Sequence, residues 1–183
     1  NVFGEEVIKI NRSESTSRIW RTGHAQLNGG VLAIKGDLTV DNVLTFDNGP
    51  GNKPRGDGVI YVRGDLIVNN TSAYELISGI GGNMERVASV VWIVEGDVVV
   101  NKDMGSPVVG VTDMVGAYFV LGRDDVDLDD GVGTFVVNGV TPVEYQDGLR
   151  DKPFQLEGLV AAEHFQLDRQ FIDDFTLQSP AEH

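Results

Sequence analysis

The chain has 183 residues, no cysteine, and 28 acidic against 14 basic side chains, which gives a formal net charge of −14. This charge argues against nucleic acid and against anionic membrane surfaces as partners. The lack of cysteine excludes a disulfide scaffold and a zinc–thiolate site. No apolar stretch approaches the ~20 residues of a membrane-spanning helix, so we expect no direct membrane insertion.

Residues 1–22 combine a few apolar residues with a stretch rich in Ser, Arg and Glu, and they match no later segment. We expect an irregular N-terminal cap here, because the first unit of a repeat array would otherwise expose strand edges with unpaired backbone N–H and C=O groups. Trp20 is the residue expected to fill that end. The first residue, Asn1, is not a methionine, which suggests a processed or trimmed chain.

A ten-residue phrase then occurs three times, and in each copy Gly-Asp separates two apolar runs. Alternate residues on one side of the phrase are all apolar, with the glycine at their centre, which predicts strands that bury one face. A glycine on the inward side marks a bend where no side chain fits. Each phrase is therefore predicted to be two short strands hinged at Gly-Asp. The copies are Val31–Val40, Val59–Val68 and Val91–Val100.

The three central glycines, Gly36, Gly64 and Gly96, follow one another at spacings of 28 and 32 residues. Self-similar strand units that bury their apolar faces by stacking indicate a solenoid. We predict an all-β, single-domain parallel β-helix, with repeat coils over residues 31–167 and a C-terminal tail or cap over residues 168–183. A β-sandwich is the alternative fold. A second stacked corner is expected at the polar pairs Asp41-Asn42, Asn69-Asn70 and Asn101-Lys102.

Stacking would place Asp37, Asp65 and Asp97 in one ladder, where like charges at the ~4.8 Å strand spacing repel. Turn N–H groups at the corner of each aspartate are the expected partners. A cation that bridges the carboxylates is the alternative.

The phrase degenerates after residue 115, where shorter apolar runs keep the same outline. We predict strands up to Leu167, because the apolar residues before it alternate and Gly158 occupies the repeat position. A helix over residues 159–175 is the alternative. The segments are Val115–Gly122, Thr134–Gly139, Phe154–Ala162 and His164–Leu167.

Five short segments carry a resemblance to known proteins: Gly58–Leu66, Val115–Leu121, Val136–Val140, Leu159–Arg169 and Ser179–Glu182. Together they are similar to segments of large secreted proteins of uncultured bacteria, some of them pilin-like. The polymer-forming bactofilins share only the β-solenoid pattern. The resemblance covers about residues 30–182 and implies an extracellular or cell-surface location with a structural or adhesive role, but it transfers no catalytic residue.

The densest acidic run is Asp124–Asp130, which as a strand places alternate carboxylates on one face. Calcium takes six to eight oxygen ligands, so these side chains with carbonyls and water are a candidate calcium site. A solvated acidic edge that blocks strand pairing is the alternative, with no cofactor at all. The candidate metal ligands are Asp124, Asp125, Asp127 and Asp129.

Two functions are consistent with this sequence. The first is a non-enzymatic extracellular or cell-envelope module for structure or adhesion, whose partners are further copies of the chain, other envelope proteins or surface glycans. The alternative is a calcium-assisted polysaccharide lyase or a glycoside hydrolase of the β-helix type. That enzyme would use Asp124, Asp125 and Asp127, with Arg123 or Arg150 nearby.

Overall fold

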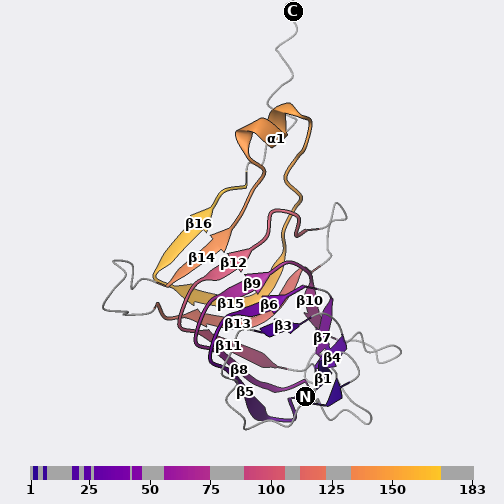
Figure 1. The fold of residues 1–183 in the computed structure, drawn as a ribbon, viewed down its shortest axis with the longest axis vertical. Helices are drawn as coiled ribbons and strands as arrows, with labels where there is room; N and C mark the ends of the chain where they lie inside the picture. The colour runs from indigo at the N-terminus through magenta and orange to yellow at the C-terminus, as the bar shows by residue number, and fades with distance from the viewer. Residues whose placement is uncertain are drawn as a thin grey trace, which may run out of the picture.

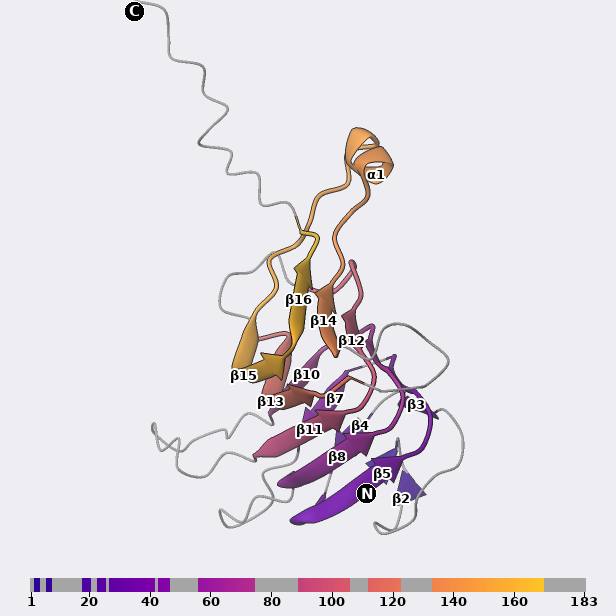
Figure 2. The same ribbon diagram turned by 90° about the vertical axis from the view of Figure 1, so that its left-hand side faces the viewer.

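The structure is a computed structural model that describes residues 2–3, 6–7, 18–20, 23–25, 27–41, 43–46, 56–74, 89–105, 112–122 and 133–169. These residues form sixteen strands and one short helix, so the prediction of an all-β protein is confirmed. Three of the four sheets are parallel (Figures 1 and 2).

From β3 onward, strands that follow one another in the chain belong to different sheets, and each sheet is ordered as the chain runs. The five-stranded sheet contains β5 (Gly30–Ile34), β8 (Gly58–Val62), β11 (Val90–Val94), β13 (Met114–Val120) and β15 (Leu156–Ala162). The six-stranded sheet contains β3 (Arg18–Trp20), β6 (Leu38–Val40), β9 (Leu66–Val68), β12 (Val98–Val100), β14 (Thr134–Val137) and β16 (His164–Leu167). The three-stranded sheet contains β4 (Gly23–Ala25), β7 (Leu44–Phe46) and β10 (Ser72–Tyr74). A separate antiparallel pair joins β1 (Val2–Phe3) to β2 (Glu6–Val7).

We call each set of consecutive strands that begins in the five-stranded sheet a rung. The first three rungs begin with β5, β8 and β11, and Leu32 lies opposite Ile60, which lies opposite Trp92. This register aligns the three phrases as the sequence predicts. The later rungs are β13–β14 and β15–β16. Parallel pairing between rungs differs from the antiparallel hairpins that a β-sandwich requires.

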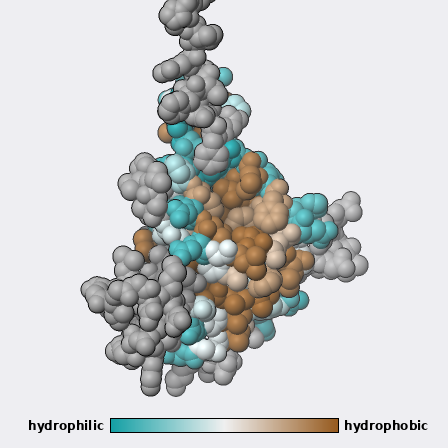
Figure 3. All heavy atoms as spheres, turned by 180° about the vertical axis from the view of Figure 1, so that it is seen from behind, coloured by the Kyte–Doolittle hydropathy of each residue, from teal (hydrophilic) through white to brown (hydrophobic). Residues whose placement is uncertain are grey.

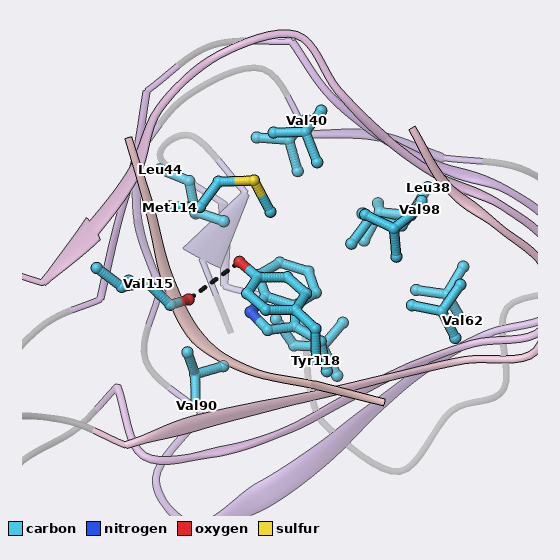
Figure 4. Packing of buried hydrophobic residues seen from close by; sticks show 14 of the residues in the cluster. Leu38, Val40, Leu44, Val62, Val90, Val98, Met114, Val115 and Tyr118 are labelled. Atoms are coloured by element: carbon cyan, nitrogen blue, oxygen red, sulfur yellow. Dashed lines mark hydrogen bonds between the residues drawn. The ribbon is translucent and has the colours of Figure 1, made fainter. Parts of the chain in front are cut away.

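The bend inside each phrase lies at the predicted Gly-Asp, where one strand ends and the next begins in a different sheet. Residues of one parity, such as Ile34, Leu66 and Val98, are buried in a continuous apolar core. The strands of the sheets surround this core, as Figure 4 shows. Alternation therefore predicted the inward residues correctly, because side chains along a strand point to opposite faces.

Aromatic rings run along the core from rung to rung. The ring of Trp92 stacks on that of Tyr118 with centroids 5.6 Å apart, and Phe46 contacts Trp92 edge-on at 5.9 Å. Phe135 packs edge-on against Tyr118 at 6.3 Å, and Phe165 follows Phe135 at 6.2 Å. The Tyr118 hydroxyl donates to the Val115 carbonyl at 3.0 Å (Figure 4), which satisfies a polar group inside the core.

Strands near the two ends of the chain test the predicted N-terminal cap and the predicted last strands. Residues 18–20, placed in the expected N-terminal cap, form β3 and pair in parallel with β6, so Trp20 lies opposite Val40. Residues 156–167 form two strands, so the strand prediction up to Leu167 is confirmed and the helix alternative is wrong over that range.

Between β14 and β15 the chain leaves the sheets as an arm, residues 138–155, that carries helix α1 (Pro142–Gln146) at its tip (Figures 1 and 2). The helix begins with a capping box, in which the Thr141 side chain accepts from Glu144 N and the Glu144 side chain accepts from Thr141 N. Lys102 forms an ion pair with Glu144 and so ties the arm to the turn after β12.

Candidate functional site

The predicted calcium ligands Asp124, Asp125, Asp127 and Asp129 lie outside the described residues, as does Arg123. Arg150 is described and lies in the arm, where its guanidinium stacks over the Tyr145 ring, 4.0 Å from its centroid. Within the described ranges, no group of three or more His, Asp or Glu side chains is arranged to hold a metal ion. The described part of the chain also contains no helix long and apolar enough to cross a membrane.

The aspartates of the three phrases form a ladder of hydrogen bonds. Asp37 Oδ1 accepts from Asp65 N at 3.0 Å, and Asp65 Oδ1 accepts from Asp97 N at 2.9 Å. Asp97 Oδ1 continues the series by accepting from Thr134 N at 2.8 Å. The expectation that backbone N–H groups bind these carboxylates is confirmed, with one correction. The donor belongs to the next rung and not to the aspartate's own corner.

The glycines of the phrase make room for this ladder. A Cβ atom on Gly64 would lie 2.1 Å from Asp37 Oδ1, and one on Gly96 would lie 2.2 Å from Asp65 Oδ1. Backbone atoms of the preceding rung stand 2.8 Å from both positions. The glycine of one rung is therefore required by the aspartate of the rung before it and by the backbone of that rung.

The second predicted corner also forms a ladder. Asn69 Nδ2 donates to Asp41 Oδ1 at 3.3 Å, and Asn101 Nδ2 donates to Asn69 Oδ1 at 3.1 Å. At both corners, a polar side chain of one rung is therefore hydrogen-bonded to a polar group of the next rung. These bonds fix the register between rungs.

The outer face of the five-stranded sheet is apolar, and the sequence analysis missed it. Over the five residues that all its strands share, two residues per strand point away from the core, and Val31, Phe119 and Leu159 among them are exposed. Figure 3 shows a continuous hydrophobic patch on this side of the molecule. The signal was available, because strands apolar at both parities are typical of sheets covered on both faces. We call these ten residues the outer face: Val31, Ala33, Val59, Tyr61, Val91, Ile93, Ala117, Phe119, Leu159 and Ala161.

A column of residues follows the outer face along the bend at its rim. The register aligns Lys35 with Arg63, then Glu95, Leu121 and Glu163. The first two positions of this rim column are basic, whereas the third and fifth are acidic.

A hydrogen bond links the middle of the rim column to the outer face, and an ion pair lies within the column. The Tyr61 hydroxyl donates to Glu95 Oε1, and Arg63 Nε lies 3.7 Å from Glu95 Oε2. The hydrogen bond with Glu95 raises the pKa of the Tyr61 hydroxyl, and burial and the negative charge of Glu95 act in the same direction. Tyr61 therefore remains neutral across the physiological range.

The last rung exposes residues at positions that are buried in the rung before it. Phe165 lies opposite Phe135 and Leu167 opposite Val137. Phe135 and Val137 are 3% and 4% exposed, whereas Phe165 and Leu167 are 56% and 68% exposed. Strands β15 and β16 are the last strands of their sheets in the described part of the chain. The open end of the stack, which we define as β15 and β16, thus combines strand edges with uncovered apolar side chains.

Arg169 fastens the arm to the sheets. Its guanidinium donates to three carbonyls, those of Asn138 at 3.3 Å, Lys152 at 2.5 Å and Asn101 at 3.1 Å. Burial lowers the pKa of this guanidinium, against the opposing charges of Asp151 and Asp113.

Asp113 is buried next to the start of β13. Its carboxylate accepts from Gln155 N at 2.9 Å. Burial raises the pKa of the Asp113 carboxyl, and the hydrogen bond from Gln155 and the charge of Arg169 offset part of this rise. The arrangement of these charged groups holds the arm in place.

Comparison with known proteins gives no relative of this chain: no family model, no curated protein and no solved structure matches it. The functional conclusion therefore depends on the geometry of the two ladders, the outer face and the open end.

Proposed function

We propose that the chain is a parallel β-helix that serves as a non-enzymatic structural module and assembles end to end through the open end of its stack. Rung-by-rung parallel pairing supports the β-helix, since each strand of one rung lies against the same strand of the next. The resemblance to secreted and cell-surface proteins adds the expectation that the assembly lies outside the cell or in its envelope.

The exposure of Phe165 and Leu167 is the observation that carries this proposal. Each side chain occupies a core position that the previous rung buries, so one more rung would cover both. Burying an aliphatic or aromatic side chain contributes ~1.5–3 kcal/mol. A strand added in parallel would also pair with the backbone edges of β15 and β16.

The opposite ends of the two large sheets supply a candidate for that added rung. Strand β5 is the first of the five-stranded sheet, and β3 is the first of the six-stranded sheet. If the open end of one copy receives these strands from another, the contact is heterologous and continues from copy to copy. Heterologous contacts that do not close into a ring produce filaments.

The test is sedimentation velocity of the chain over a wide concentration range. We expect the mass of the wild-type chain to rise past that of a dimer with concentration, and Phe165→Asp combined with Leu167→Asp to abolish every species larger than a dimer. Gln166→Asp is the matched control, because Gln166 lies between these residues with its side chain on the opposite side of β16. A wild-type chain that stays monomeric, or a double variant that associates as the wild type does, would contradict the proposal.

A further inference from the structure

We infer that the outer face of the five-stranded sheet binds a second copy of this chain, face to face, about a two-fold axis parallel to the strands. This contact is separate from the open end, and it does not require end-to-end assembly.

The lack of charge on the outer face is the first argument. Its ten residues are all uncharged, in a chain with 28 acidic and 14 basic residues. A net charge of −14 makes two copies repel each other, so close approach is opposed least at a surface whose centre carries no acidic groups. The outer face provides such a surface over all five strands, with large side chains such as Ile93 and Phe119 near its middle.

The charge pattern of the rim column identifies the occupant as a second copy. A two-fold axis along the strands reverses the order of the rungs but keeps the bend at the same side of the interface. With the axis between β8 and β11, Arg63 of one copy faces Glu95 of the other, and the converse pair forms on the far side of the axis. The four side chains then alternate in sign around the axis. Such isologous complementarity is the property that a two-fold interface needs.

The contacts already present in one chain prepare this arrangement. Glu95 accepts a hydrogen bond from Tyr61 and lies 3.7 Å from Arg63, so its carboxylate is held at the rim of the outer face. The Arg63 side chain remains 55% exposed, which leaves its guanidinium accessible to a second carboxylate. An arginine can bind two carboxylates at once because its guanidinium presents five N–H donors.

The size of the outer face sets the strength of the contact. With the axis between β8 and β11, β5 faces β13 and β8 faces β11, so four strands of each copy overlap. Four strands ~4.8 Å apart and five residues long at ~3.3 Å each give a footprint of roughly 320 Å². A standard stable interface buries about 800 Å² on each partner. The two-fold dimer is therefore weak by itself, and it would be reinforced where end-to-end assembly repeats the face along a filament.

The experiment isolates this contact by closing the open end with Phe165→Asp and Leu167→Asp. In that background, sedimentation equilibrium at high protein concentration should show a monomer–dimer equilibrium. Ile93→Asp should remove the dimer, and so should Val31→Asp on the edge strand β5, where the side chain is already exposed. Ile67→Asp is the matched control, since Ile67 points outward from the six-stranded sheet. Far-ultraviolet circular dichroism checks that each variant remains folded.

Charge exchange tests the axis. Arg63→Glu alone should weaken the dimer at least ten-fold, and Arg63→Glu combined with Glu95→Arg should restore it. A monomer at every concentration overturns the inference. So does a dimer that Ile93→Asp and Ile67→Asp weaken equally, or an outer face that binds a hydrophobic dye but never a second copy. Because the end-to-end contact is absent in this background, its success or failure is decided separately.

Discussion

The hydrogen-bond ladder of aspartates predicts a difference between two substitutions at Asp65. Asp65→Ala removes the acceptor for Asp97 N, which lies in a partly buried bend and donates at 2.9 Å. Hydrogen bonds to charged groups contribute ~1.5–3 kcal/mol, and a buried donor left without an acceptor costs a similar amount. We expect Asp65→Ala to lower the free energy of unfolding by about 2 kcal/mol.

Asp65→Asn should have a much smaller effect. The amide oxygen of Asn can occupy the place of Oδ1 and still accept from Asp97 N. The substitution also removes one negative charge from a stack in which Asp37 and Asp97 stand one rung away on either side. Relief of that repulsion offsets the weaker hydrogen bond, so the expected change is within about 0.5 kcal/mol.

Urea denaturation followed by circular dichroism measures both variants, with Asp41→Ala as the matched control. Asp41 is an exposed acceptor of the other corner, where its bond to Asn69 is 3.3 Å long, so its loss should cost less than about 0.5 kcal/mol. Equal destabilisation by Asp65→Ala and Asp65→Asn would refute the reasoning. That result would mean that the charge itself is required, as it would be if a cation bridged the carboxylates.

Three further predictions concern other parts of the structure. Gly96→Ala should destabilise the protein by ~1–3 kcal/mol through overpacking, and by clearly less in an Asp65→Ala background, which a double-mutant cycle in urea would show. The folded-state pKa of Asp113 is raised, so its contribution to stability is present below its ordinary pKa of about 4 and is lost as pH rises. Asp113→Asn should therefore gain stability relative to wild type between pH 4 and pH 7, measured by thermal melts; an unchanged difference would contradict this. Arg169→Ala should raise hydrogen exchange across residues 138–155, and Arg169→Lys should not restore protection, because an ammonium cannot reach three carbonyls as the guanidinium does.

Local periodicity was sufficient to predict the two strands of each phrase and their inward residues, but not the three-stranded sheet of β4, β7 and β10. Burial of Leu38, Leu66 and Val98 follows from alternation around the central Gly-Asp, which requires no knowledge of what lies next to each strand. The capping box at Thr141 and Glu144 was equally readable from the Thr-x-x-Glu pattern, although it was not used.

Contacts between rungs could not be derived in the same way. The donor to Asp37 is 28 residues away and the donor to Asp97 is 37 residues away, so their identity depends on a register that varies from rung to rung. The arm is a stronger case, since Arg169 binds a carbonyl 68 residues before it. The acidic run at 124–130 remains a prediction, because those residues lie outside the described ranges.

The glycine and the aspartate of the phrase belong to different structural units, although they are adjacent in the sequence. Gly64 accommodates the carboxylate of Asp37, and Gly96 that of Asp65, so each pair that matters spans two rungs. The last two rungs fit this explanation. Thr134 stands in the aspartate position of the fourth rung, and the bend of the fifth rung is a single residue, Glu163, between Ala162 and His164. Where no carboxylate projects from the rung before, the Gly-Asp pair is absent. The repeated Gly-Asp therefore reflects contacts between neighbouring rungs. This explains why the pair is absent from the last two rungs, next to the open end.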